Sequence, residues 1–178
     1  MRRWLALALL VATSWVHAAG AELSAFAVQR GEDGVSIDYA LNFELPRGAE
    51  EALAKSVPLY FVAEFHLTRG RWYWLDQTVV SATRERRVSY APLTEQYRVI
   101  TSGISQNVTS FEDVRRLLSR VRSWTIAEKG QLKAGERYEA AFRFRLDTSQ
   151  LPKPFQLNVI TSRDWTLASE WYRWGYTP

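Results

Sequence analysis

Residues 34–45 read GVSIDYALNFEL, and their side chains alternate between apolar and polar. Val35, Ile37, Tyr39, Leu41 and Phe43 fall on one side of this stretch, and Ser36, Asp38, Asn42 and Glu44 fall on the other. Successive side chains of a β-strand point to opposite faces of its sheet. The pattern therefore predicts an antiparallel strand with one buried face and one face in water.

Two further stretches follow the same rule, RYEAAFRFRLD at residues 137–147 and LYFVAEFHL at residues 59–67. Asp33-Gly34 predicts a hairpin before the first strand, and Gly70 separates the strand that ends at Leu67 from the next one. Shorter strands are expected in RWYWLDQTVV (71–80), VSYAPL (88–93) and EQYRVIT (95–101), and in a hairpin made of FQLNVI (155–160), TSRD and WTLASEW (165–171).

Two helices interrupt the strands. RGAEEALAKS (47–56) predicts a short polar helix, and TSFEDVRRLLSRVRSW (109–124) predicts an amphipathic one. Thr109 and Glu112 have the spacing of a capping box, which satisfies free amides of the first helical turn. Phe111, Val114, Leu117, Leu118 and Val121 form its apolar stripe, and Arg115, Arg116, Arg120 and Arg122 occupy the rest.

Together the segments predict an all-β fold, a single antiparallel β-sandwich of about nine or ten short strands with two short helices. An immunoglobulin-like sandwich and a partly open barrel are both compatible with this pattern, because strand pairings are not evident from the sequence. There is no internal repeat and no linker. We expect one domain over residues 22–178.

The N-terminus has the three parts of a secretory signal peptide. MRRW is basic, LALALLVATSWV is apolar but too short to span a membrane, and HAAGA supplies small residues for cleavage. We expect residues 1–21 to be a signal peptide, with cleavage after Ala21 or, as second choice, after Ala18. The mature protein is then expected to be periplasmic and to have no membrane span.

Removing 21 of the 178 residues leaves 157, enough for one domain that buries about two-thirds of its unfolded surface. Loss of Arg2 and Arg3 lowers the net charge from +4 to +2. So small a charge gives no electrostatic reason to expect a nucleic-acid partner. The absence of cysteine is compatible with export, since a domain of this size does not require disulfides.

The usual catalytic inventories are missing from the sequence. There is no cysteine, and His66 is the one histidine of the expected mature chain, on the polar face of its strand. We interpret His66 as a structural residue, because no motif supplies a nucleophile beside it. No metal-binding cluster and no glycine-rich phosphate loop is evident, so no cofactor is expected. Two carboxylates could still meet in space, which leaves a glycan hydrolase open.

The aromatic and basic residues are the remaining candidates for a binding surface. Trp165 and Trp171 are interpreted as core residues of the last strand, whereas Tyr172, Trp174 and Tyr176 on its other face are left undecided between core and surface. The basic helix face is most simply a solvated face, but it could also meet an anionic partner. The candidate partner-binding residues are Trp72, Trp74, Tyr172, Trp174, Tyr176, Arg115, Arg116 and Arg120.

Several longer stretches resemble a known family, the exported Gram-negative proteins grouped as domain of unknown function 4390. They are EALAKSVPLYFVAEFHL, RWYWLDQTV, VSYAPLTEQYRV, SFEDVRRLLSRVRSW and DWTLASEWYRW, in that order along the chain. The resemblance implies a single exported domain and transfers no catalytic residue. It also implies a link to sensor kinases, whose exported domain becomes a candidate partner.

The sequence thus favours a non-enzymatic, periplasmic interaction module that binds another envelope protein. Two other classes remain open. One is a carboxylate-dependent hydrolase of envelope glycans, and the other is a carrier that holds a lipid or small molecule between its sheets.

Overall fold

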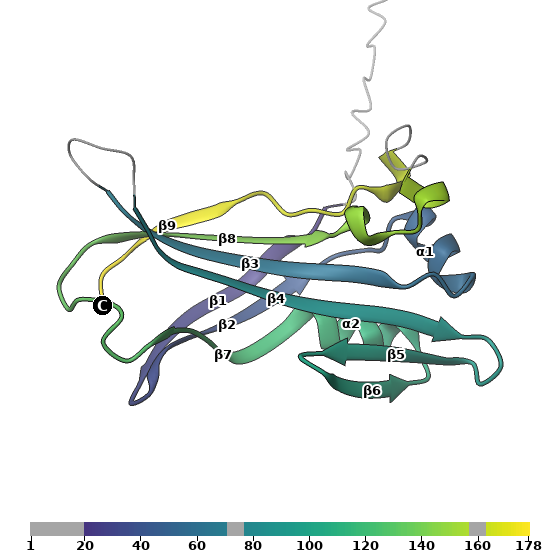
Figure 1. Ribbon diagram of the computed structural model, residues 1–178, viewed down its shortest axis with the longest axis horizontal. Helices are drawn as coiled ribbons and strands as arrows, with labels where there is room; N and C mark the ends of the chain where they lie inside the picture. The colour runs from purple at the N-terminus through teal and green to yellow at the C-terminus, as the bar shows by residue number, and fades with distance from the viewer. Residues whose placement is uncertain (1–19, 71–76, 157–162) are drawn as a thin grey trace, which may run out of the picture.

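The computed structural model describes residues 20–70, 77–156 and 163–178, and in these residues nine strands form two antiparallel sheets (Figure 1). The small sheet has the order β1-β2-β7, and the large sheet has the order β6-β5-β4-β3-β8-β9. The all-β sandwich is confirmed, because the described strands form two separate sheets and do not close into a barrel.

The elements follow one another along the chain, with α-helices and short 3₁₀ helices among the strands, and residues 153–156 are also helical. The labelled elements are β1 (Glu22–Gly31), β2 (Gly34–Asn42), α1 (Arg47–Ala54), β3 (Leu59–Arg69), β4 (Gln77–Ala91), β5 (Gln96–Thr101), β6 (Ile104–Val108), α2 (Phe111–Ser119), β7 (Arg120–Glu128), β8 (Tyr138–Leu146), η1 (Thr148–Gln150), η2 (Arg163–Trp165) and β9 (Tyr172–Tyr176). None of the helices in this part of the chain is long and apolar enough to cross a membrane.

The core lies between the two sheets, and aromatic rings supply much of it. The small sheet lies obliquely across one face of the large sheet (Figure 1). From β2 and the residues after it, the Tyr39 ring lies 4.9 Å from that of Phe142 and the Phe43 ring lies 5.4 Å from that of Phe144. The predicted alternation placed these rings on the apolar faces of their strands. The three strands predicted from strict alternation are confirmed as β2, β3 and β8.

The β1–β2 hairpin forms at the predicted turn, where Gly31 pairs with Gly34. Gly34 has φ of +143°, and a Cβ atom at this position would collide with the backbone carbonyl of Ala127 on β7. Glycine is therefore required here both for its backbone conformation and for the close approach of the third strand.

The helix predicted for residues 109–124 is wrong in its second half. α2 ends at Ser119, and Arg120 begins β7, which pairs with β2. A bulge in β7, between the residues that pair with Ile37 and Tyr39 of β2, lets Val121 and Trp124 both face the core. The first turn also differs from the prediction, because Ser110 rather than Thr109 caps α2. The Ser110 hydroxyl accepts a hydrogen bond from the Asp113 amide at 3.1 Å.

Two predicted strand boundaries are also wrong. VSYAPL is not a separate strand, because residues up to Ala91 continue the 15-residue β4, which pairs with β3 and β5. The predicted C-terminal hairpin is tested only in part, because residues 157–162 lie outside the described residues. Phe155 and Gln156, which begin its predicted first strand, are helical. Within WTLASEW, Ala168 makes an isolated bridge with Arg145, and the strand β9 starts later and pairs with β8.

Trp165 is buried in the core as predicted, but the same prediction for Trp171 is wrong. Trp171 precedes β9, is half-buried, and lies against the His66 ring with 5.4 Å between the ring centres. His66 lies on the outward face of β3, where the small sheet does not reach it.

Candidate functional site: an arginine-lined cavity

A cavity of about 320 Å³ lies at the C-terminal end of α2, between the large sheet and β7. Its walls come from β4, β5, β6, the turn between β5 and β6, α2 and β7. The lining residues are Arg84, Arg86, Val99, Thr101, Ser102, Ile104, Gln106, Leu117, Arg120, Val121 and Arg122. Four of them are arginines and none is acidic, so the lining is strongly basic.

Arg86 is the buried base of the cavity. It is 7% exposed, and its guanidinium donates hydrogen bonds to the carbonyl oxygens of Leu117 at 2.7 Å and Leu118 at 2.8 Å. These carbonyls belong to the last turn of α2, where carbonyl groups lack partners within the helix and carry partial negative charge. Burial lowers the pKa of Arg86 and the like charge of Arg84 lowers it further, whereas Tyr39 acts in the opposite direction.

Arg84 lies two residues before Arg86 and therefore points from the same face of β4. Its Nε atom is buried and has no hydrogen-bond partner in the described part of the chain. A buried donor without an acceptor is costly, and natural proteins rarely leave one without a ligand or water. Arg143 on β8, away from this cavity, has a buried and unpartnered Nε as well, so this feature does not by itself mark a ligand site.

Arg120 and Arg122 form the opposite wall, on β7. Both are exposed, and neither makes an ion pair with a carboxylate in the described residues. Asp38 is the nearby carboxylate, and it accepts a hydrogen bond from the Ser123 amide at 2.7 Å, at the bulge in β7. The two exposed arginines therefore keep their positive charge uncompensated at the mouth of the cavity.

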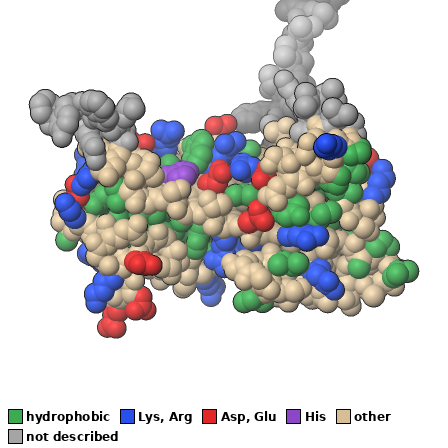
Figure 2. Space-filling view, viewed as in Figure 1, with side chains coloured by type: hydrophobic (Ala, Val, Ile, Leu, Met, Phe, Trp, Pro, Cys, Tyr) green, Lys and Arg blue, Asp and Glu red, His purple; other side chains and the backbone are tan. Residues whose placement is uncertain are grey.

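Such a site can bind an anion. Guanidinium groups donate paired, charge-assisted hydrogen bonds to carboxylates and phosphates, and partial burial strengthens them. Figure 2 shows that the charged side chains in view over β5 and β6 are basic. In the described residues, no group of three or more histidine, cysteine, aspartate or glutamate residues could hold a metal ion. The chemistry present at the cavity is recognition of negative charge.

The structure separates the three arginines predicted as part of a binding surface. Arg115 forms an ion pair with Glu112 at 2.7 Å, and Arg116 forms one with Asp113 at 3.0 Å, each three residues apart on α2. Their charges are balanced within the helix. Arg120, by contrast, lies on a strand and lines the cavity.

The predicted aromatic residues of β9 face the small sheet. The Trp174 ring lies 4.4 Å from the Phe26 ring of β1, and the Tyr172 hydroxyl accepts a hydrogen bond from the Leu23 amide at 2.8 Å. Tyr172, Trp174 and Tyr176 are half-buried and pack against the core. Trp72 and Trp74 lie outside the described residues. A role in partner binding stays a prediction for all five.

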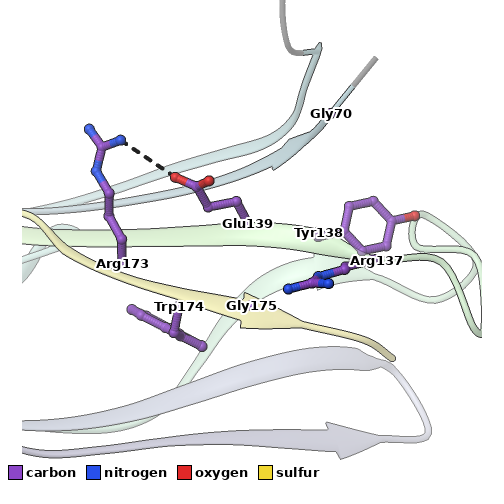
Figure 3. A pocket seen from close by; sticks show the side chains of 7 residues that line it. All are labelled: Gly70, Arg137, Tyr138, Glu139, Arg173, Trp174 and Gly175. Carbon is purple, nitrogen blue, oxygen red and sulfur yellow. Dashed lines mark hydrogen bonds and ion pairs between the residues drawn. The ribbon is translucent and has the colours of Figure 1, made fainter. Parts of the chain in front are cut away.

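A second hollow, of about 590 Å³, lies where β8 begins and β9 ends (Figure 3). Arg173 and Glu139 stand on one side of the β8–β9 ribbon and form an ion pair at 3.4 Å, whereas Trp174 points to the other side, toward the small sheet. The lining residues therefore do not converge on one point, and two of the three charged ones already form an ion pair with each other. This hollow is a weaker candidate than the arginine-lined cavity.

The sequence analysis missed Arg84 and Arg86 and placed Arg122 on a helix. A signal for the first two was present, because Val80, Ala82, Arg84, Arg86 and Val88 share one face of β4. Two arginines at inward positions of a strand require an explanation, since arginine is almost never buried without a partner. The site itself was not evident, because its residues come from separate elements that only the fold brings together.

The chain matches the family described as Domain of unknown function (DUF4390) over residues 18–175. The match covers most of the sequence, and the chain belongs to this family. The expected resemblance is confirmed. Searches of the curated proteins and of the solved structures gave no match.

Proposed function

We propose that this protein is an exported, non-enzymatic binding module of the cell envelope, and that its arginine-lined cavity recognises an acidic region of a partner protein. The observation that supports this function is the convergence of four arginines on one cavity whose lining contains no carboxylate. The exported domain of a sensor kinase is the candidate partner that the family resemblance suggests.

The character of the cavity favours this proposal over the two alternatives. A glycoside hydrolase needs two carboxyl groups about 5–10 Å apart across its substrate, and no lining residue of this cavity is acidic. A carrier for an apolar molecule needs a mainly apolar lining with few polar groups. Four arginine side chains in a small cavity would make the burial of such a molecule unfavourable.

Binding of a fluorescein-labelled hexaglutamate peptide, followed by fluorescence anisotropy at low ionic strength, tests the proposal. We expect the double variant Arg120→Gln and Arg122→Gln to raise the Kd about tenfold or more, because each charge-assisted hydrogen bond contributes about 1.5–3 kcal/mol. The matched control is the double variant Arg115→Gln and Arg116→Gln. It removes the same charge from α2, where both arginines are already ion-paired.

We expect the control to change the Kd less than about threefold, since exposed ion-paired charges contribute little. Equal losses in the two double variants would show that only the net charge of the protein matters. No binding by the wild-type protein would likewise contradict the proposed recognition of acidic segments. Circular dichroism of each variant verifies that the sheets are intact.

A further inference from the structure

The edge of the large sheet at β6 lies beside the arginine-lined cavity and lacks the features that usually protect sheet edges. Such protection comes from charged residues, proline or bulges. The edges of the small sheet, β1 and β7, both contain register shifts, and β9 carries Arg173. β6 reads ISQNV, has no charge and no proline, and pairs with β5 without a shift.

The turn before β6 determines which backbone groups face the free edge. Ser102 and Gly103 have φ of 48° and 83°, and Thr101 pairs with Ile104 across them. Two positive φ values define a type I′ turn, in which the flanking residues form a hydrogen-bonded pair. Bonding alternates along an antiparallel ladder. The amide and carbonyl groups of Ser105 and Asn107 therefore point away from β5, toward the free edge.

The side chains of β6 connect this edge to the cavity. Ile104 and Gln106 line the cavity, and Ile104 is 69% exposed. A strand added about 4.8 Å beyond β6 would have its own alternate side chains, opposite these two residues, on the same face. Arg120 and Arg122 of β7, which line the same cavity, contribute positive charge on this face. Carboxylates on the added strand would complement them.

We propose that an extended acidic segment of a partner protein adds to the large sheet beside β6, with Asp or Glu at alternate positions facing the arginine-lined cavity. Backbone hydrogen bonds to Ser105 and Asn107 supply affinity, and the alternate carboxylates supply selectivity, as in other cases of strand addition. This mode of binding rests on the proposed function and specifies the form of the ligand.

The experiment compares two peptides of identical composition. One has the sequence Thr-Glu-Thr-Glu-Thr-Glu-Thr, and the other has its three Glu residues together at one end. Affinity is measured by isothermal titration calorimetry, and the exchange of the Ser105 and Asn107 amides is measured by NMR. We expect the alternating peptide to bind at least about fivefold more tightly and to slow exchange at both amides, because only its spacing suits a strand beside β6.

Two further tests remove backbone pairing without changing charge. The alternating peptide, N-methylated at every second backbone nitrogen, can no longer donate to β6, and we expect it to lose at least about tenfold in affinity. Ser105→Pro removes one outward amide while the bonds between β5 and β6 remain, since proline is tolerated at an edge. This variant is expected to lower the affinity for the unmodified peptide by a similar factor. The methylated peptide keeps the proposal testable if the variant does not fold.

The outcomes separate the two proposals. If both peptides bind equally, N-methylation has no effect and binding still depends on Arg120 and Arg122, the cavity recognises acidic segments and strand addition is wrong. If neither peptide binds and the hexaglutamate peptide also does not bind, both proposals are wrong. If the amides of Ser105 and Asn107 become protected with rising protein concentration and no peptide, a second copy occupies the edge, and this overturns the assignment to a partner.

Discussion

At the scale of single residues, Arg86 links the fold to the candidate site. Its guanidinium lies inside the protein without a carboxylate and donates instead to the two carbonyls that end α2. The same residue therefore satisfies carbonyls of the last turn of α2 and contributes positive charge at the base of the cavity. The neighbouring Arg84 shares this face of β4 and lines the same cavity.

Replacing Arg86 with methionine should lower the free energy of unfolding by about 1–3 kcal/mol, because the carbonyls of Leu117 and Leu118 lose their donors in a buried place. Arg87→Met is the matched control, since this neighbour points to the outer face and lies over the Tyr60 ring at 5.8 Å. We expect it to cost less than about 1 kcal/mol. Urea denaturation, monitored by circular dichroism, measures the free energy of unfolding of both variants. Similar losses in the two variants would contradict the role assigned to Arg86.

At the scale of elements, the strands with strict alternation were predictable and the helix–strand boundary after Ser119 was not. Alternation is a local pattern, so residues 34–45, 59–67 and 137–147 carry their own signal. The last turn of α2 accepts hydrogen bonds from Arg86, which precedes Leu117 by 31 residues and meets it only in the folded protein. A continuous helical stripe through Val121 was compatible with the sequence, but pairing of β7 with β2 determined the outcome.

The first turn of α2 offers a direct test of a corrected assignment. Ser110→Ala removes the acceptor of the Asp113 amide and should destabilise the protein by about 1 kcal/mol. Thr109→Ala, one residue earlier and exposed, should change stability by less than about 0.5 kcal/mol. Thermal and urea unfolding of the two variants decide between the caps. A larger effect at Thr109 would restore the capping box first predicted from the sequence.

At the scale of the whole molecule, composition and pattern were sufficient for the fold class but not for the site. The all-β sandwich follows from many short alternating segments, whereas the cavity needs β4, β7 and α2 in contact. Of the residues first proposed for binding, Arg120 reaches this cavity, and Arg115 and Arg116 are balanced by Glu112 and Asp113. Side chains separated along the chain converge only through strand order, which a single sequence does not encode locally.

Export is the prediction that concerns the entire chain. Protein purified from the periplasmic fraction should begin near Glu22, the first residue of β1, when its intact mass is measured. Ala21 is buried in the core, so a start at Ala19 would retain one more core residue than a start at Glu22. Mass spectrometry distinguishes the two. A periplasmic protein that retained Met1 would contradict the assignment of residues 1–21 as a cleaved signal peptide.

The pairing of β2 with β7 has a consequence for how the molecule assembles. The hydrogen bond between Ser123 and Asp38 joins residues 85 positions apart, and the strands β3 to β6 lie between them in the chain. Closing so long a loop carries an entropic cost before any contact forms, and it slows folding. The β1–β2 hairpin therefore keeps Ile37 and Tyr39 uncovered until later strands of the chain, among them β7 and β8, have packed against it.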